Sequence, residues 1–162
     1  MKIHSQIIII NNFTNSIKRF VNNFNKLPDY LKKCIVIEND DKVFNVSDTL
    51  KISDMINVPI VLDYHHYKCN KSDIDIKKIF NTWNIKPKLH FSSPKSKKNF
   101  RSHSDYINSD DFIEFIEFIK KYNTDVDIML ETKMKDEALF RLVRELKYKT
   151  NYNFIDDTSF EI

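Results

Sequence analysis

Acidic and imidazole side chains recur at the carboxyl ends of apolar segments in this sequence. Glu38, Asp63 and Glu131 each follow directly on a short apolar run, and His90 lies within another such run. Carboxylate oxygens and imidazole nitrogens together suit Mn²⁺ or Zn²⁺, whereas a set without thiolates argues against a structural zinc site. The pattern therefore predicts a divalent-metal site, although any one such carboxylate can also be a helix cap or a solvated charge.

Two adjacent histidines, His65 and His66, come shortly after Asp63. Neighbouring side chains in extended structure point to opposite sides, so these two imidazoles are not expected to reach the same centre. Asp63 and His66 are three residues apart across a bend. We expect this pair, and not His65, to act together.

A loop between His90 and His103 combines hydroxyl groups with four cations. The cations are Lys95, Lys97, Lys98 and Arg101. Such a composition could contact the phosphates of a nucleic acid, or it could be no more than a solvated basic loop. Beside a metal cluster, a phosphate-binding loop predicts metal-assisted phosphodiester hydrolysis. Sugar isomerisation is the competing chemistry, but it gives the loop cations no role.

The elements that must position these residues alternate between β-rich runs and stretches with helical spacing. Such alternation is typical of βαβ units with a parallel sheet covered by helices, and about five units are present, fewer than in a closed eight-stranded barrel. The helical spacing is clearest before residue 25, between 112 and 119, and between 138 and 146. The β-rich runs are residues 7–10, 34–37, 59–62, 88–91 and 126–130.

Helix ends are predicted from polar residues, because the sequence contains no glycine. Serines followed by aspartate supply cap oxygens and negative charge for the first turn, which predicts helix starts at Ser47, Ser72 and Ser109. Without glycine, asparagine is the residue best suited to the left-handed backbone at a helix end. This predicts helix stops at Asn57, Asn84 and Asn123.

Length and composition predict one globular domain over residues 1–162, with a loosely attached tail at 151–162. The chain has 162 residues, 41% of them hydrophobic, and a formal net charge of +3. Cys34, expected to be buried in a strand, and Cys69 give no disulfide framework, which suits a reducing compartment. No apolar run is long enough to span a bilayer and no secretory signal is present. We expect an intracellular protein, cytoplasmic or nuclear.

Several longer motifs resemble the UV damage endonuclease family, in the order in which that family carries them, between about residue 15 and residue 146. They lie at residues 27–33, 38–42, 58–66, 80–83, 87–94, 101–106 and 127–138. The resemblance implies a TIM barrel of the xylose-isomerase-like kind. It also implies an enzyme that nicks damaged double-stranded DNA 5′ of photolesions, using two or three divalent ions, typically Mn²⁺.

The resemblance also implies roles for individual residues. Glu131 and Lys88 would be catalytic, with Lys88 either carboxylated at the metal cluster or a cationic phosphate contact. His4 could match a further histidine ligand, but the family follows that residue with two glycines, where this sequence has Ser5 and Gln6. The implied metal ligands are Glu38, Asp63, His66, His90, His103 and Glu131.

The chain departs from the family in length, since family members are about twice as long. What is present resembles the carboxyl-terminal portion, from near the fourth barrel strand onward. A partial barrel of about five βα units leaves uncovered strand edges. We therefore expect a separate amino-terminal half or a second copy to complete it, unless the chain is a degenerate remnant. A noncatalytic DNA-binding or assembly partner is the alternative function, and a sugar isomerase-like enzyme is a third.

Overall fold

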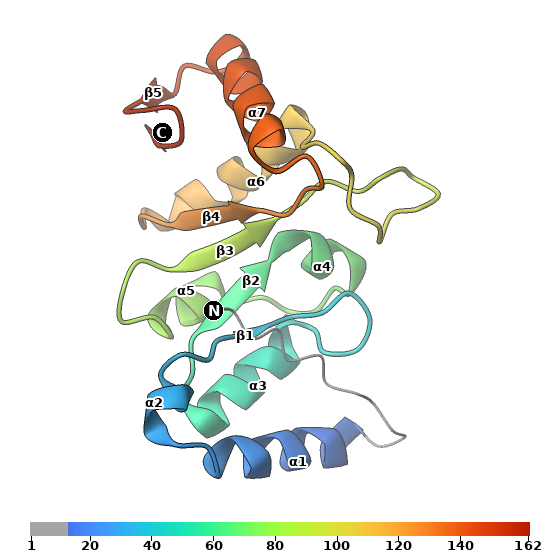
Figure 1. The fold of residues 1–162 in the computed structure, drawn as a ribbon, viewed down its shortest axis with the longest axis vertical. Coiled ribbons are helices and arrows are strands. Elements are labelled where there is room, and N and C mark those ends of the chain that lie inside the picture. The colour runs from blue at the N-terminus through green and yellow to red at the C-terminus, as the bar shows by residue number, and fades with distance from the viewer. Residues whose placement is uncertain (1–12) are drawn as a thin grey trace.

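The computed structural model describes residues 13–162, in which a parallel sheet is flanked by helices (Figure 1). The strands run in the order β1-β2-β3-β4, and each neighbouring pair is parallel. The expected α/β architecture with a parallel sheet is confirmed. The predicted run 7–10 and His4 lie outside the described residues. The strands are β1 (Ile37–Glu38), β2 (Ile60–Asp63), β3 (Lys88–Phe91) and β4 (Asp127–Leu130).

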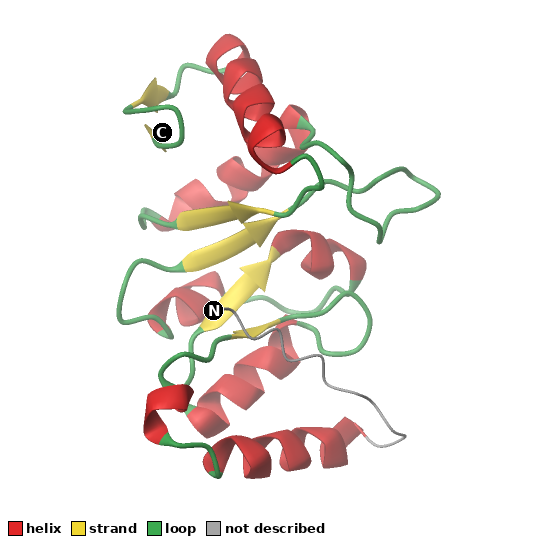
Figure 2. Cartoon of the chain, in the orientation of Figure 1, coloured by secondary structure: helices red, strands yellow, loops and turns green. Residues whose placement is uncertain are grey.

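Helices connect the strands, so the chain alternates as the sequence predicts (Figure 2). In Figure 1, α1 and α3 lie beside β1 at one end of the molecule, and α7 lies beyond β4 at the other end. None of the described helices is both long and apolar enough to cross a membrane. The helices are α1 (Phe13–Asn25), α2 (Asp29–Lys32), α3 (Val46–Ile56), α4 (Tyr64–Cys69), α5 (Ile76–Asn81), α6 (Ser109–Ile119), the 3-10 helix η1 (Lys120–Tyr122) and α7 (Lys135–Lys149).

The two faces of the sheet differ in chemistry. Leu62, Leu89 and Phe91 are buried in the hydrophobic core, where the ring of Phe91 lies 4.9 Å from that of Phe115 of α6. Successive side chains of a strand point to opposite faces. The residues that alternate with this apolar set, such as Asp63 and His90, therefore face away from the helical core. Core packing on one face fixes the positions of polar side chains on the other.

At the amino end of β2, side chains and not β3 satisfy the backbone hydrogen-bonding groups of the strand. The pairing of β2 with β3 includes Leu62 and Asp63. At Ile60, the N–H donates to Thr82 Oγ1 (3.0 Å) and the carbonyl accepts from Trp83 Nε1 (2.7 Å). Because unpaired buried backbone groups are costly, these two bonds hold the buried amino end of β2 in place.

The first predicted strand is shorter than expected because a turn precedes it. The predicted run 34–37 reduces to Ile37 at the start of β1, since the N–H groups of Cys34 and Ile35 donate back to the carbonyls of Leu31 and Lys32. The prediction that Cys34 is buried is wrong: it is exposed, and its thiol contacts the carbonyl of Tyr30. The predicted run 88–91 coincides with β3.

The predicted serine caps are wrong, because Asn or Asp takes each capping position. Asn45 caps α3, Asp75 caps α5 and Asn108 caps α6, each accepting from a backbone N–H of the first turn. Ser47 and Ser109 instead lie inside their helices, and Ser72 lies before Asp75. The N-cap is the residue directly before the first helical residue. In each of these helices that position is occupied by an Asn or Asp and not by the predicted serine.

Two of the three predicted asparagine stops are confirmed. Asn57 (φ 53°) ends α3 and Asn123 (φ 46°) ends η1, both in left-handed conformation. Asn84 is not such a stop, because α5 already ends at Asn81 and its C-cap Thr82 is right-handed. Asparagine thus supplies the positive φ angles that glycine usually supplies.

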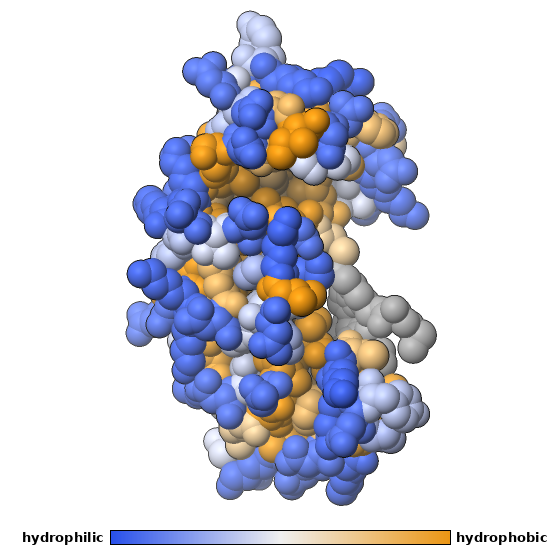
Figure 3. All heavy atoms as spheres, turned by 90° about the vertical axis from the view of Figure 1, so that its left-hand side faces the viewer, coloured by the Kyte–Doolittle hydropathy of each residue, from blue (hydrophilic) through white to orange (hydrophobic). Residues whose placement is uncertain are grey.

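The segment 151–162 forms a small antiparallel hairpin of β5 (Asn153–Phe154) and β6 (Phe160–Glu161). Phe160 stacks on Tyr152, with ring centroids 5.0 Å apart, and approaches Phe112 of α6 at 6.5 Å. The assignment of residues 1–162 to one domain with a loose tail stays a prediction. Figure 3 shows the face at the amino ends of the strands, where hydrophilic side chains are interspersed with hydrophobic ones.

Candidate metal centre

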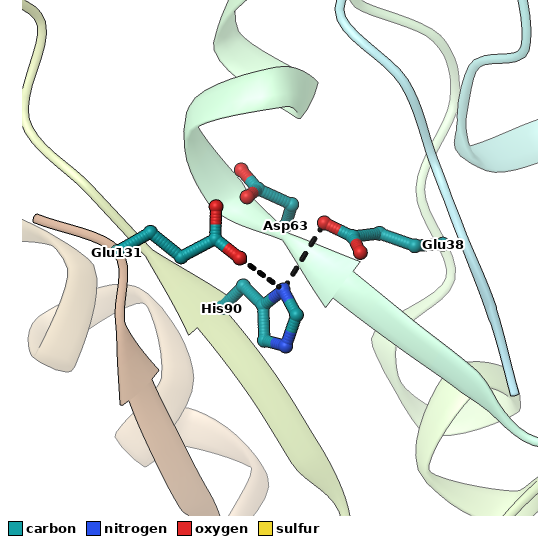
Figure 4. A group of neighbouring side chains, drawn as sticks. All are labelled: Glu38, Asp63, His90 and Glu131. Carbon is teal, nitrogen blue, oxygen red and sulfur yellow. Dashed lines mark hydrogen bonds and ion pairs between the residues drawn. The ribbon is translucent and has the colours of Figure 1, made fainter. Parts of the chain in front are cut away.

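Four side chains from four strand ends converge at one edge of the sheet (Figure 4). Each offers one ligand atom, and these atoms all lie within 4.8 Å of one another. His90 Nδ1 lies 3.0 Å from Glu131 Oε1 and 3.1 Å from Glu38 Oε1. We call this group the ligand cluster; its members are Glu38, Asp63, His90 and Glu131.

The register of the sheet brings these residues together. Asp63 of β2 lies directly opposite His90 of β3. Glu131 follows β4, and its N–H donates to the carbonyl of Phe91 (2.8 Å), so the pairing of β4 with β3 continues one residue beyond the strand. Carboxyl ends of neighbouring parallel strands meet at one edge, which is where α/β folds place ligands.

Asn39 joins β1 to β2 at this edge. Its side-chain amide accepts from the N–H of Asp63 and donates to the carbonyl of Asp63, both at 3.0 Å. It is 1% exposed. The side chain of Asn39 thus bonds to Asp63 as the backbone of a neighbouring strand would. These two bonds fix the backbone of Asp63, a member of the ligand cluster. Our sequence reasoning did not identify Asn39, although its place directly after Glu38 was a usable signal.

His66 lies at the border of the cluster. Asp63 caps α4 by accepting from the N–H of His66 (2.7 Å), so the helix begins immediately after the strand. His66 Nδ1 lies 3.0 Å from the carbonyl oxygen of Asn39 and 3.7 Å from both Asp63 Oδ2 and Glu38 Oε1. A bond from Nδ1–H to a carbonyl leaves Nε2 as the atom with a free lone pair, the usual arrangement of metal-binding histidines.

His103 and His65 lie together beside the cluster. His103 Nδ1 is 3.7 Å from Glu131 Oε2, and its ring centroid is 5.8 Å from that of His66. His65, 1% exposed, places Nε2 3.4 Å from the carbonyl oxygen of Arg101 and its ring edge-on to His103. His66 and His103 therefore both border the cluster, whereas His65 links it to the loop that follows β3.

Lys88, the predicted catalytic lysine, forms its ion pair with Asp127, outside the ligand cluster. Its Nζ donates to Asp127 Oδ2 at 2.6 Å, across the register that pairs Lys88 with Asp127. Lys88 and His90 are two residues apart on β3, so they share a face. The sequence reasoning had not named Asp127.

The charged groups of the cluster shift one another's pKa values. Burial alone would lower the pKa of His90, but hydrogen bonds from its ring to Glu131 and Glu38, with their negative charges, outweigh it and raise the pKa to about 9. The same bond to His90 lowers the pKa of Glu131 to about 2. Burial raises the pKa of Asp63 to about 6, with His66 acting in the opposite direction. One imidazolium thus lies between carboxylates.

The residues fit a divalent cation on two grounds. Asp63 Oδ2 is buried without a hydrogen-bond partner among the described residues. Burying such an oxygen is costly unless something pairs with it. Burial also lowers the pKa of His103, which keeps that imidazole neutral and able to act as a ligand. The ligand cluster offers three carboxylates and one imidazole, so it could hold a metal ion with mixed oxygen and nitrogen ligands.

The loop after β3 projects from the same edge, on the right of Figure 1. An isolated bridge between Pro94 and His103 closes its base, and the N–H of Lys95 donates to the carbonyl of Ser102 (2.7 Å). We call residues 94–103 the basic arm. Arg101 Nε lies 3.9 Å from Asp41 Oδ2. The remaining cations are exposed and form no ion pair with a described residue: Lys95, Lys97 and Lys98.

Comparisons with known proteins identify the family of this chain. The family described as "UV-endonuclease UvdE" matches residues 3–161. A "UV DNA damage endonuclease" of Bacillus cereus (strain G9842) is 46% identical over 138 residues, covering 81% of this chain and 44% of the relative. The protein of the same description from Bacillus anthracis (strain A0248) is 43% identical, with the same coverage.

A solved structure also matches. "Crystal Structure of SacUVDE" superimposes with a TM-score of 0.75 at 34% sequence identity, covering 86% of this chain and 48% of that chain. This chain therefore spans less than half the length of the curated relatives it matches. The expected TIM-barrel class, as a partial barrel, and the family resemblance are both confirmed. The chain belongs to the UvdE family of UV endonucleases.

Proposed function

We propose that this chain carries most of the metal centre of a UV damage endonuclease that nicks damaged double-stranded DNA 5′ of the lesion. The observation that supports this most directly is the convergence of four ligand atoms within 4.8 Å at the edge from which the basic arm projects. A metal centre and a phosphate-binding surface are the two parts that hydrolysis of a DNA backbone needs.

The proposed ligands of the metal centre are the ligand cluster together with His66 and His103. When bound there, two or three divalent ions, Mn²⁺ by our proposal, would lower the pKa of a water molecule and stabilise charge on the phosphate oxygens. His90 must release its Nδ1 proton before that nitrogen can serve as a ligand. Glu131 then loses its imidazolium partner and becomes available to a cation.

Lys88 has two possible roles in this proposal. As a carbamate it would provide an oxygen ligand, and as an ammonium it would contact a phosphate. We favour the phosphate contact, because a carbamate would lose the ion pair of Nζ with Asp127 Oδ2. The proposed phosphate contacts of the arm are Lys95, Lys97, Lys98 and Arg101.

Nicking of supercoiled DNA tests the proposal. With Mn²⁺, irradiated plasmid should be nicked more than unirradiated plasmid, and Glu131→Gln should abolish the difference. Glu117→Gln is the matched control, because Glu117 of α6 is exposed and forms an ion pair with Lys120 of η1. Equal nicking of both plasmids would leave a metal nuclease without lesion specificity. Turnover of a small sugar with indifference to DNA would instead indicate an isomerase-like enzyme.

A noncatalytic DNA-binding or assembly partner is the second candidate, favoured by the short span of the chain relative to its relatives. The proposed partners of the chain are a separate amino-terminal half or a second copy. A chain that binds DNA but holds no Mn²⁺, and whose DNA affinity is unchanged by Asp63→Asn, would favour this candidate over the nuclease.

A further inference from the structure

An exposed aromatic ring lies among the cations of the basic arm. Phe100 is 37% exposed, although it is a large apolar side chain. Lys97, Lys98 and Arg101 are its close neighbours in the chain and are also exposed. A single exposed phenylalanine is ordinary on a protein surface. Its place in a cation-rich protrusion is what gives this ring a candidate role.

The arm that carries Phe100 is held in a defined shape. Beyond the bridge at its base, the N–H of Asn99 donates to Ser96 Oγ (3.0 Å) and the N–H of Ser102 donates to the carbonyl of Asn99 (3.2 Å). The N–H of Ser104 donates to the carbonyl of Ser93 (2.8 Å). A ring on such a loop needs less ordering on binding than a ring on a flexible chain.

The buried side chain of His65 packs against the ring of Phe100. The centroids of Phe100 and His65 are 5.6 Å apart. His65 in turn lies 5.2 Å from the ring of His103, which approaches Glu131. Three rings in succession therefore lead from the arm to the border of the ligand cluster. A group that contacts Phe100 would place its neighbouring phosphates close to the proposed metal centre.

We propose that Phe100 is a stacking surface for a nucleobase that is not paired within the bound DNA. This inference rests on the proposed function and adds a residue, Phe100, that would distinguish DNA with an unpaired base from fully paired DNA. Every base has an aromatic face, and stacking on a protein aromatic is tolerant of sequence. The lysines beside the ring hold the backbone by charge, whereas the ring distinguishes an unpaired base from a paired one.

Binding to two short duplexes tests the inference, one fully paired and one with a single unpaired nucleotide. Fluorescence anisotropy with the whole chain, at several salt concentrations and without divalent ions, gives the affinities. Phe100→Leu should weaken binding of the duplex with the unpaired nucleotide by about 5- to 150-fold, and the fully paired one by less than about twofold. Phe100→Trp should bind both as the original chain does.

Two further variants separate stacking from charge and from general surface effects. Lys97→Ala should weaken binding of both duplexes alike and reduce the salt dependence by about 0.9 in log–log slope, whereas Phe100→Leu should leave the slope unchanged. Phe140→Leu is the matched control, because Phe140 of α7 is also an exposed phenylalanine, 49% exposed against 37% for Phe100. It should change neither affinity.

The outcomes distinguish this inference from the proposed function. If Phe100→Leu weakens neither duplex, or weakens both equally, the stacking role is refuted and DNA binding stands. If the original chain binds neither duplex, the proposed function fails for this chain, and the inference fails with it.

Discussion

The ligand cluster and the basic arm lie at the same edge of the sheet, yet their charges are satisfied in opposite ways. In the cluster, His90 is 2% exposed and meets two carboxylates that come from other strands. In the arm, Lys97 and Lys98 are exposed and pair with no described residue. The cluster is thus organised by the fold before any cation binds, whereas the arm keeps its charge available to a partner.

This difference indicates two kinds of recognition. Buried charges interact strongly over short distances and tolerate little displacement. Exposed charges act over a longer range, and salt weakens them. Substitutions in the cluster should therefore have large effects on metal binding and stability. Substitutions in the arm should have small effects that depend on ionic strength.

The largest effect is expected for Asp63→Asn. Asparagine retains the capping of α4 but removes the negative charge that a cation would meet, so Mn²⁺ affinity should fall by about 100-fold or more, beyond the loss typical of outer-shell changes. A Mn²⁺ titration followed by electron paramagnetic resonance measures this. Asp54→Asn, at an exposed ion pair with Lys78, is the control. Unchanged Mn²⁺ affinity would remove Asp63 from the metal centre.

Asn39→Ala should have the next largest effect. It leaves the buried N–H and carbonyl of Asp63 without partners, which should lower the free energy of unfolding by about 2–4 kcal/mol. Mn²⁺ affinity should also fall by about 10- to 100-fold, because Asn39 positions a ligand. Urea unfolding and Mn²⁺ titration measure the two, with Asn153→Ala, in the exposed hairpin, as the control. A loss of stability alone would make Asn39 structural only.

The charge balance of the cluster should give the metal-free protein a pH-dependent stability. The pKa of His90 is raised to about 9 in the folded state, above its ordinary value near 6.5. A raised imidazole pKa adds stability that is complete below pH 6.5 and is lost as the pH rises through 9, by about 3 kcal/mol at most.

Thermal unfolding between pH 6.5 and pH 9.5, in the presence of a chelator, measures this loss. His90→Gln should flatten the curve over the same interval, because glutamine does not titrate. His103→Gln is the matched comparison: burial lowers the pKa of His103, so its substitution should leave the decline above pH 7 in place. A decline that survives in His90→Gln would mean that another group causes it.

The positions of the cluster residues could be predicted from the sequence, because an apolar run that ends in a polar residue is a local signal. Glu38, Asp63 and Glu131 each directly follow a short apolar run, and this predicted that they lie at the carboxyl ends of strands before the register was known. The side-by-side pairing of Asp63 and His90 follows from the register of a parallel sheet. The convergence of these residues was therefore predictable to within a side chain's reach.

Other features depended on contacts between distant segments. The amide of Asn39 bonds to Asp63, 24 residues away, and the local sequence offers only its place directly after Glu38 as a signal. The pairing of Lys88 with Asp127 needs the register of β3 with β4. The misplaced cap at Ser109 has a local cause, since the competing Asn108 stands one residue earlier. Residue types thus predicted which groups could hold a metal ion, and tertiary contacts decided how these groups are positioned.

The smallest effect is expected where the arm meets the rest of the chain. Asp41→Asn removes the partner of Arg101, whose Nε lies 3.9 Å away on the surface. Because exposed ion pairs contribute little, the free energy of unfolding should change by less than about 0.5 kcal/mol. The freed guanidinium and the loss of one negative charge should raise DNA affinity about two- to threefold at low salt, measured by anisotropy.

A double-mutant cycle with Arg101→Ala sharpens this test. If Asp41 acts by holding Arg101, Asp41→Asn should raise DNA affinity in the original chain but not in the Arg101→Ala background. Asp105→Asn, at the exposed pair with Lys133, reports the general effect of losing one negative charge. An equal gain in all three cases would show that the arm responds to net charge alone, and that its cations are interchangeable in the way that the cluster residues are not.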